Sequence, residues 1–113
     1  MILKELKQIE ALSFLPVLKR LGKANPGYLS FPLAGWTLSI DLPANNKKIE
    51  ALLKKMDIEI EKSGGKHYLA KDSRQTAVIF SNTYKSVNIW QEQKRILDPK
   101  NIFISDISKR LKI

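Results

Sequence analysis

The sequence has no cysteine and a single histidine, His67, among its 113 residues. The absence of cysteine excludes disulfide bonds, thiolate metal sites and cysteine nucleophiles. One histidine without a cluster of acidic residues does not supply the ligands typical of a protein metal site, so we expect no metal. His67 has no acidic partner at a telling spacing, and we interpret it as a strand-surface or packed histidine rather than a catalytic base.

Long apolar runs are also missing. No stretch approaches the roughly 18 apolar residues that a membrane-spanning helix needs. The first 14 residues combine a helical pattern with acidic side chains, which is unlike a signal peptide or a transit peptide. The glycine-rich loops G-x-G-x-x-G and G-K-[ST], which hold nucleotide phosphates, are absent. These features predict a soluble, cytoplasmic protein with one domain, residues 1–113.

Acidic residues are few relative to basic ones, and the net charge is +9. A basic domain can bind nucleic acid, an anionic membrane or a phosphorylated ligand. Here the lysines are dispersed, and no block of five or six basic residues occurs. A solvated basic surface is the simpler interpretation, and a binding module for nucleic acid or another polyanion stays open as an alternative function.

The pattern of apolar residues predicts an α+β fold, a small antiparallel sheet flanked by helices. Helices are expected at 2–12, where apolar residues recur at helical spacing, and at about 46–62, where an asparagine cap precedes and Ser63-Gly64-Gly65 follows. A glycine- and proline-rich loop separates two of the three expected strands. The strands are expected at 13–21, 35–43 and 66–70, further helices at 73–82 and 84–96, and one or two helical turns after 104.

Alternation in the segment GWTLSIDLP predicts a half-buried strand with one polar face. The residues expected on its buried face are Trp36, Leu38, Ile40 and Leu42. Those expected on its polar face are Thr37, Ser39 and Asp41. Trp36 and Trp90 are interpreted as core aromatics, and the polar face is a candidate ligand wall.

A dense polar cluster ends the segment GGKHYLAKDSR, residues 64–74. If its strand pairs beside 35–43, Tyr68 and Lys71 lie near the polar face, and Lys71 supplies a fixed positive charge to a developing anion or a polarised hydroxyl. The other interpretation is structural: Asp72 caps a helix and Lys71 forms a surface salt bridge. Spacing alone leaves both open.

Three segments in the same order carry a resemblance to a known family: FLPVLKRLG…NPGYLSFPLAGWTLSIDLP, GGKHYLAKDSRQTA and DPKNIFISDISKRL. Together they resemble the C-terminal part of FAD-linked oxidases of the vanillyl-alcohol-oxidase type, in particular the decaprenylphosphoryl-β-D-ribose oxidase group, which is close to the sugar-lactone oxidases. The likeness runs from about Ser13 to Leu111.

The resemblance implies a partial substrate (cap) domain that covers a flavin held by another domain. In that family a hydride passes from a sugar carbinol carbon to FAD. The family's active-site lysine matches Lys71 and its pocket tyrosine matches Tyr68; both line the cavity over the flavin ring, where cofactor and substrate meet. Two substrate-binding positions on the preceding strand match Thr37 and Ser39. The family usually has other residues at these two positions, which leaves open whether the substrate is the same.

Complete oxidases of this type have several hundred residues, and the FAD-gripping domain has no counterpart here. We therefore expect the C-terminal substrate-domain segment of an FAD-dependent sugar or alcohol oxidoreductase, inactive alone and dependent on an FAD-binding partner chain. Such a segment should expose an apolar face, covered by that partner or by self-association. A non-functional remnant of a truncated oxidase gene is a further alternative.

Overall fold

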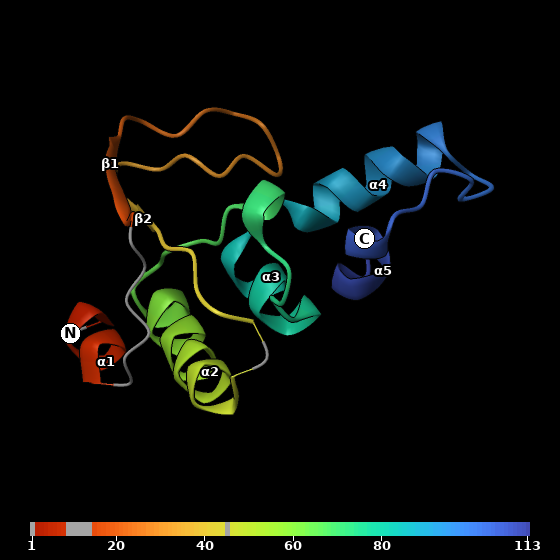
Figure 1. Cartoon of the computed structure of the whole chain (residues 1–113). Coiled ribbons are helices and arrows are strands. Elements are labelled where there is room, and N and C mark those ends of the chain that lie inside the picture. The colour runs from red at the N-terminus through yellow and green to blue at the C-terminus, as the bar shows by residue number, and fades with distance from the viewer. Residues whose placement is uncertain (1, 9–14, 45) are drawn as a thin grey trace. The chain divides into compact units, whose positions relative to one another are not determined.

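A computed structural model describes residues 2–8, 15–44 and 46–113. The chain divides into two compact units, residues 1–24 with 32–59 and residues 25–31 with 60–113, and each is described by itself. Five α-helices and one two-stranded antiparallel sheet in the described part confirm the expected α+β class (Figure 1). The elements are α1 (Ile2–Gln8), β1 (Val17–Leu21), β2 (Gly35–Ser39), α2 (Lys47–Lys62), the 3₁₀ helix η1 (Leu69–Lys71), α3 (Ala77–Thr83), α4 (Val87–Leu97) and α5 (Asp106–Leu111).

The first unit contains the sheet, in which β1 pairs with β2 from Val17 opposite Ser39 to Leu21 opposite Gly35. Strand β1 begins directly after Pro16, which the prediction had placed inside the strand; proline cannot donate to a ladder. The predicted strand was longer at its start, and residues 13 and 14 lie outside the described part. The long loop predicted between the strands is confirmed.

The faces of β2 are the reverse of the prediction. Trp36 is 68% exposed and Leu38 is 36% exposed, whereas Thr37 and Ser39 are partly buried. The prediction that Trp36 is a core aromatic is therefore wrong. The strand ends at Ser39, and beyond that end Ile40 and Leu42 pack against the core of this unit, as predicted for these two residues. The alternation of apolar and polar residues continues past Ser39, where the strand stops, so the pattern on either side of that residue does not belong to one strand.

The exposed side of the sheet bears three apolar side chains together with Arg20, which lies opposite Trp36. Leu18 lies opposite Leu38 in the register and is 60% exposed. Directly paired residues and residues two apart on one strand point to the same face. Leu18, Trp36 and Leu38 therefore share one side, called the apolar ribbon face below.

The core of the first unit joins α1 to α2 through Leu6 and Ile49, both buried. Helix α2 begins as predicted, because Asn46 Oδ1 accepts hydrogen bonds from the N–H groups of Lys48 (3.0 Å) and Ile49 (3.3 Å). Of the predicted opening helix, α1 covers Ile2–Gln8, and residues 9–12 lie outside the described part.

The stop of α2 also follows the prediction. Gly64 has φ +71°, and the N–H of Gly65 donates to the carbonyl of Ile60 at 2.8 Å. This left-handed residue with its return hydrogen bond satisfies carbonyls that the last helical turn leaves without a partner.

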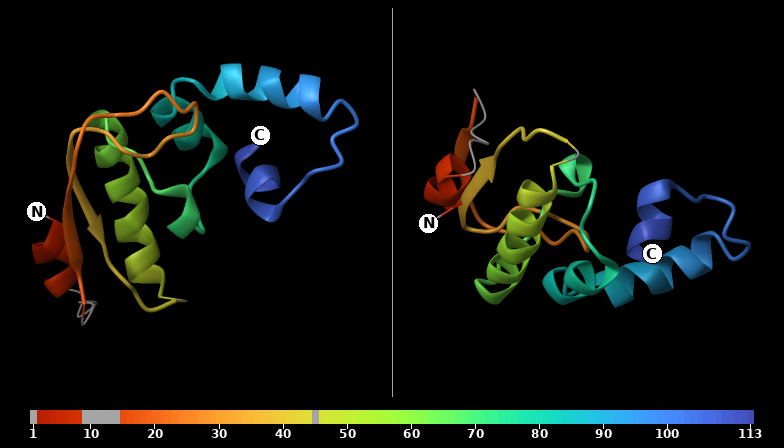
Figure 2. Two further views of the ribbon diagram at one scale, coloured as in Figure 1. Left: turned by 90° about the horizontal axis from the view of Figure 1, so that it is seen from above. Right: turned by 60° about the horizontal axis from the view of Figure 1, so that its bottom comes forward.

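The core of the second unit is formed by Phe80, Tyr84, Val87 and Leu111, which come from α3, the junction after it, α4 and α5. The chain reverses after α4, and α5 returns toward α3 (Figure 2). The two predicted helices of this region and the closing helical turns are confirmed, although α3 begins four residues and α4 three residues later than expected. Helix α3 starts late because Thr76 is its cap, with its hydroxyl oxygen accepting from the N–H of Ile79 at 3.3 Å.

The strand predicted at 66–70 is not found. The N–H of Lys71 donates to the carbonyl of Tyr68 (2.9 Å), and that of Asp72 to the carbonyl of Leu69 (3.3 Å). These local bonds close a 3₁₀ turn, so the backbone groups are not available to a ladder. The predicted pairing of this segment with β2 is therefore wrong, and the sheet of the described residues has only β1 and β2.

Candidate functional site

The polar segment that follows α2 folds into a turn, residues 67–75, called the lysine turn below because Lys71 lies in it. Its start is tied to the core of the second unit by Tyr84, whose hydroxyl donates to the carbonyl of His67 at 2.6 Å. Tyr84 itself is fully buried, and its ring lies 4.9 Å from that of Phe80. A buried tyrosine that donates to the backbone fixes the position of the chain at that point.

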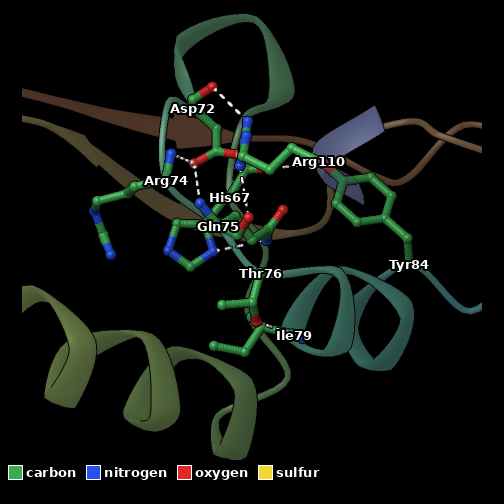
Figure 3. Close-up of polar contacts among 8 residues, drawn as sticks. All are labelled: His67, Asp72, Arg74, Gln75, Thr76, Ile79, Tyr84 and Arg110. Atoms are coloured by element: carbon green, nitrogen blue, oxygen red, sulfur yellow. Dashed lines mark hydrogen bonds and ion pairs between the residues drawn. The ribbon is translucent and has the colours of Figure 1, made fainter. Parts of the chain in front are cut away.

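Asp72 closes the turn on itself. Its side chain is only 4% exposed, and its Oδ1 accepts from the N–H groups of Arg74 (3.1 Å) and Gln75 (2.9 Å), as Figure 3 shows. An aspartate that accepts from the backbone two and three residues ahead stabilises a turn. Asp72 therefore caps the turn, while the cap of the following helix is Thr76.

Arg110, from α5, binds the other side of the lysine turn (Figure 3). Its Nη1 donates to Asp72 Oδ2 at 2.9 Å and to the carbonyl of Gln75 at 2.6 Å, and its Nη2 donates to the carbonyl of Asp72 at 3.1 Å. The planar fork of a guanidinium suits such a multiple contact. Arg110 thus fixes the loop that carries Lys71 to a helix 38 residues away in sequence. Sequence reasoning missed this contact.

Gln75 and His67 form a second buried contact of the turn. Gln75 is 1% exposed, and its Nε2 lies 3.0 Å from His67 Nδ1. With Gln75 as the donor, Nδ1 is the acceptor, so the imidazole is held as a packed side chain. The expectation that His67 is packed rather than a base agrees with this contact, although His67 lies in a loop and not on a strand.

Tyr84 keeps its proton over a wide range of pH. Burial raises the pKa of its hydroxyl to about 12, and the negative charge of Asp72 adds to the effect. Lys66 lies over the ring, with Nζ 5.0 Å from its centroid, and donates to the carbonyl of Ser30 at 3.2 Å. Tyr84 is therefore a neutral hydrogen-bond donor to the backbone of the lysine turn at His67.

The structure brings two of the predicted site residues together. Lys71 is exposed at the end of η1, and Tyr68, at its start, is 48% exposed with its ring 5.1 Å from that of Phe31. Thr37 and Ser39 lie together on the partly buried side of β2. The two pairs belong to different units, each described by itself. The lysine turn therefore presents one cation and one aromatic ring from a scaffold fixed by buried hydrogen bonds.

Two further findings concern metal ligands and membrane-spanning helices. The described residues contain no group of three or more histidine, cysteine, aspartate or glutamate side chains that could hold a metal ion. In the same residues, no helix has the length and the apolar character that crossing a membrane requires.

Comparison with known proteins supports the likeness to FAD-linked oxidases. The chain is 37% identical to the decaprenylphosphoryl-β-D-ribose oxidase of Mycolicibacterium smegmatis over 101 residues, 89% of the chain and 22% of that protein. It is 40% identical to an uncharacterised protein of Streptomyces coelicolor, encoded in the mprA 5′ region, over 95 residues, 84% of the chain and 26% of that protein. The chain thus spans about a quarter of the length of these curated relatives. No protein-family model matches the sequence.

Proposed function

We propose that this chain is the substrate-side segment of an FAD-dependent sugar or alcohol oxidoreductase and acts with a partner chain that holds FAD. The observation that carries the proposal is the lysine turn. Lys71 and Tyr68, which match the active-site lysine and pocket tyrosine in the resemblance, are both exposed on a turn that Asp72 and Arg110 fix from inside. Exposed functional groups on a rigid support are typical of binding and catalytic loops.

The side chains of the turn fit a flavin in their chemistry. An exposed aromatic ring and an ammonium group one 3₁₀ turn apart can contact a planar, electron-accepting ring system. The chemistry that FAD supplies when bound is the acceptance of a hydride from carbon. Oxidation of the carbinol also releases its hydroxyl proton, which would pass to solvent. Lys71 would donate a hydrogen bond to the carbinol oxygen and oppose the negative charge that this proton loss leaves there. Tyr68 packs against the substrate and keeps water away.

Thr37 and Ser39 supply the polar contacts to the substrate in this proposal. Their hydroxyls can donate to and accept from sugar hydroxyls. Both are partly buried on one side of β2. In this proposal the identity of the substrate depends on this pair.

The partner is proposed to cover the apolar ribbon face. Leu18, Trp36 and Leu38 expose 60%, 68% and 36% of their surfaces, and Arg20 lies beside them on the same face. Neighbouring large apolar side chains exposed on one face are typical of a contact with another protein. Leu18→Asp should abolish co-purification of the FAD-holding chain. Lys19→Glu, on the opposite face of β1, is the matched control. If the purified chain instead forms a homodimer, and Leu18→Asp converts it to a monomer, this face serves self-association.

The catalytic role of Lys71 is tested in the complex purified from the cells that make it. Lys71→Ala should slow anaerobic flavin reduction by substrate by about 10²–10³-fold, the range for loss of one electrostatic contact in a transition state. The visible spectrum of the bound flavin should stay unchanged in this variant. Lys85 is another exposed lysine of the second unit, and the control variant Lys85→Ala should show flavin reduction at the normal rate. Normal reduction by Lys71→Ala refutes the role. A colourless chain that retains no FAD-holding partner refutes the proposed function and favours a remnant.

A further inference from the structure

The end of α4 and the loop after it expose five large apolar side chains within nine residues. They are called the apolar tip below: Ile96, Leu97, Ile102, Phe103 and Ile104. Leu97 and Phe103 are the most exposed of them, at 81% and 79%. The chain turns back toward α5 beyond this point (Figure 2). Large apolar side chains that are exposed together are typical of a surface that contacts another molecule.

Local hydrogen bonds hold the apolar tip in one conformation. The two carboxylate oxygens of Asp98 accept from the N–H groups of Ile102 (2.8 Å) and Phe103 (3.0 Å). The N–H of Asn101 donates to the carbonyl of Asp98 at 3.0 Å, and Asn101 has φ +49°, a conformation that asparagine tolerates. The tip is therefore ordered before binding, which lowers the entropy that a contact with it costs.

An apolar hollow of about 580 Å³ lies between the apolar tip and the lysine turn. Four of its lining residues pack against the core of this unit: Leu29, Leu69, Ile107 and Ile113. Phe103 of the tip, Trp90 of α4 and Ala70 of η1 line it as well. Leu69 and Ala70 are the two residues between Tyr68 and Lys71. The hollow therefore adjoins the segment that carries the two proposed site residues.

A basic hollow of about 500 Å³ borders the apolar one and shares Lys94, Ser108 and Ile113 with it. Four cationic residues line the basic hollow: Lys94, Arg95, Lys109 and Lys112. No aspartate or glutamate of the described residues lines it. The surface that complements both hollows is an apolar one with negative charge at one side.

Two observations favour the FAD-holding chain as the occupant. A second copy of this chain brings a net charge of +9, which the cationic wall repels. A chain that places a flavin over Lys71 approaches the lysine turn, and the apolar hollow starts at that turn. The volume of the hollow can accommodate apolar side chains of such a partner, and packed anchors of this kind dominate the affinity of protein interfaces.

We infer that the FAD-holding chain docks on the second unit through an apolar segment flanked by acidic residues. The apolar side chains of that segment lie against Phe103 and Trp90, and its carboxylates lie against Lys94, Lys109 and Lys112. The inference rests on the proposed function and adds the chemistry of the partner's contact. It also adds a second contact surface, in a different unit from the apolar ribbon face.

The apolar contact is tested with the FAD-holding chain that co-elutes with the tagged wild-type chain. Retained flavin absorbance measures the dissociation constant. Phe103→Asp should weaken binding at least tenfold, whereas Phe103→Leu should stay within about threefold. Val78→Asp is the matched control, because Val78 is 67% exposed on α3 and lines neither hollow. At saturating partner, Phe103→Asp should support flavin reduction at the normal rate, because the tip serves docking and not chemistry. Circular dichroism checks that each variant is folded.

The acidic flank of the partner is tested by charge reversal. Lys109→Glu should weaken binding about tenfold at low ionic strength, and in about 0.5 M sodium chloride the difference from wild type should shrink to within about threefold. Lys85→Glu, at an exposed lysine outside both hollows, should bind within about twofold of wild type under both conditions. An equal effect of the two reversals contradicts the acidic flank.

The outcomes separate this inference from the function on which it rests. If the FAD-holding chain co-elutes with the wild type and binds Phe103→Asp as well as Val78→Asp, the inference is overturned and the proposed function stands. If no FAD-holding chain co-elutes with the wild type, the proposed function fails and the inference fails with it. Phe103→Asp that only breaks a homodimer, or only stops binding to phosphatidylglycerol vesicles, while its affinity for the FAD-holding chain is unchanged, also overturns the inference.

Discussion

Arg110→Ala should be among the most destabilising single substitutions in the second unit. Arg110 makes three hydrogen bonds to the lysine turn, and one of its acceptors, the Asp72 carboxylate, is 4% exposed. Removing one partner of a buried ion pair costs about 3–5 kcal/mol, because the other charge stays buried without compensation. Two features lower this value: Arg110 is itself 27% exposed, and Asp72 keeps two backbone N–H donors. We expect a loss of about 2–4 kcal/mol in the free energy of unfolding.

The assay is urea unfolding followed by circular dichroism, with Lys109→Ala as the control. Lys109 is the exposed neighbour of Arg110 on α5, and its truncation should cost less than about 0.5 kcal/mol. A double-mutant cycle with Asp72→Asn should give a coupling energy of about 1–3 kcal/mol, as expected for residues in one hydrogen-bond network. Arg110→Lys should recover only part of the loss, because an ammonium cannot reproduce the fork. If Arg110→Ala costs no more than Lys109→Ala, the turn does not depend on this contact.

Three further predictions concern stability. Because the pKa of Tyr84 is raised to about 12, the folded chain binds more protons than the unfolded chain above pH 10. Stability should therefore fall by about 2–3 kcal/mol between pH 10 and pH 12, and Tyr84→Phe should lack this component. Gly65→Ala should cost about 1–3 kcal/mol, because its Cβ would lie 2.9 Å from Ile60 Cγ2, whereas Gly22→Ala meets no atom within 4 Å and should be neutral within about 0.5 kcal/mol. Trp36→Ala should cost less than about 1 kcal/mol in the chain alone, since the ring is 68% exposed.

Local signals in the sequence predicted the boundaries of α2. An asparagine before an apolar stripe and two glycines after it act through contacts within a few residues, and the structure contains both sets of contacts. A helix cap at Asp72 was one of two interpretations that the sequence left open. The structure has Thr76 as the cap of α3, and Asp72 binds the turn and Arg110 instead. That contact joins residues 38 apart and follows no periodic pattern, so nothing in the sequence indicates it.

The strand predicted at 66–70 failed for a related reason. A short apolar run is compatible with several backbone conformations, and its hydrogen-bond partners decide among them. Here the partners are local, because the chain closes a 3₁₀ turn between Tyr68 and Asp72. Tyr68 and Lys71 lie at the two ends of that turn instead of on a strand beside β2, and their proposed roles rest on the resemblance.

The error at Trp36 and the proposed partner have one physical explanation. Alternating large apolar residues on a strand are typical of a sheet with one covered face, yet the side that bears Trp36 and Leu38 is exposed in this chain. If a partner covers that face, the strand regains the pattern that the sequence predicts. Trp36→Ala should then have two different effects: a small one on the chain alone and a loss of about 2–4 kcal/mol in affinity for the partner, as for a buried aromatic at the centre of an interface. Equal, small effects in both measurements would show that the face stays exposed in the complex and that the partner binds elsewhere.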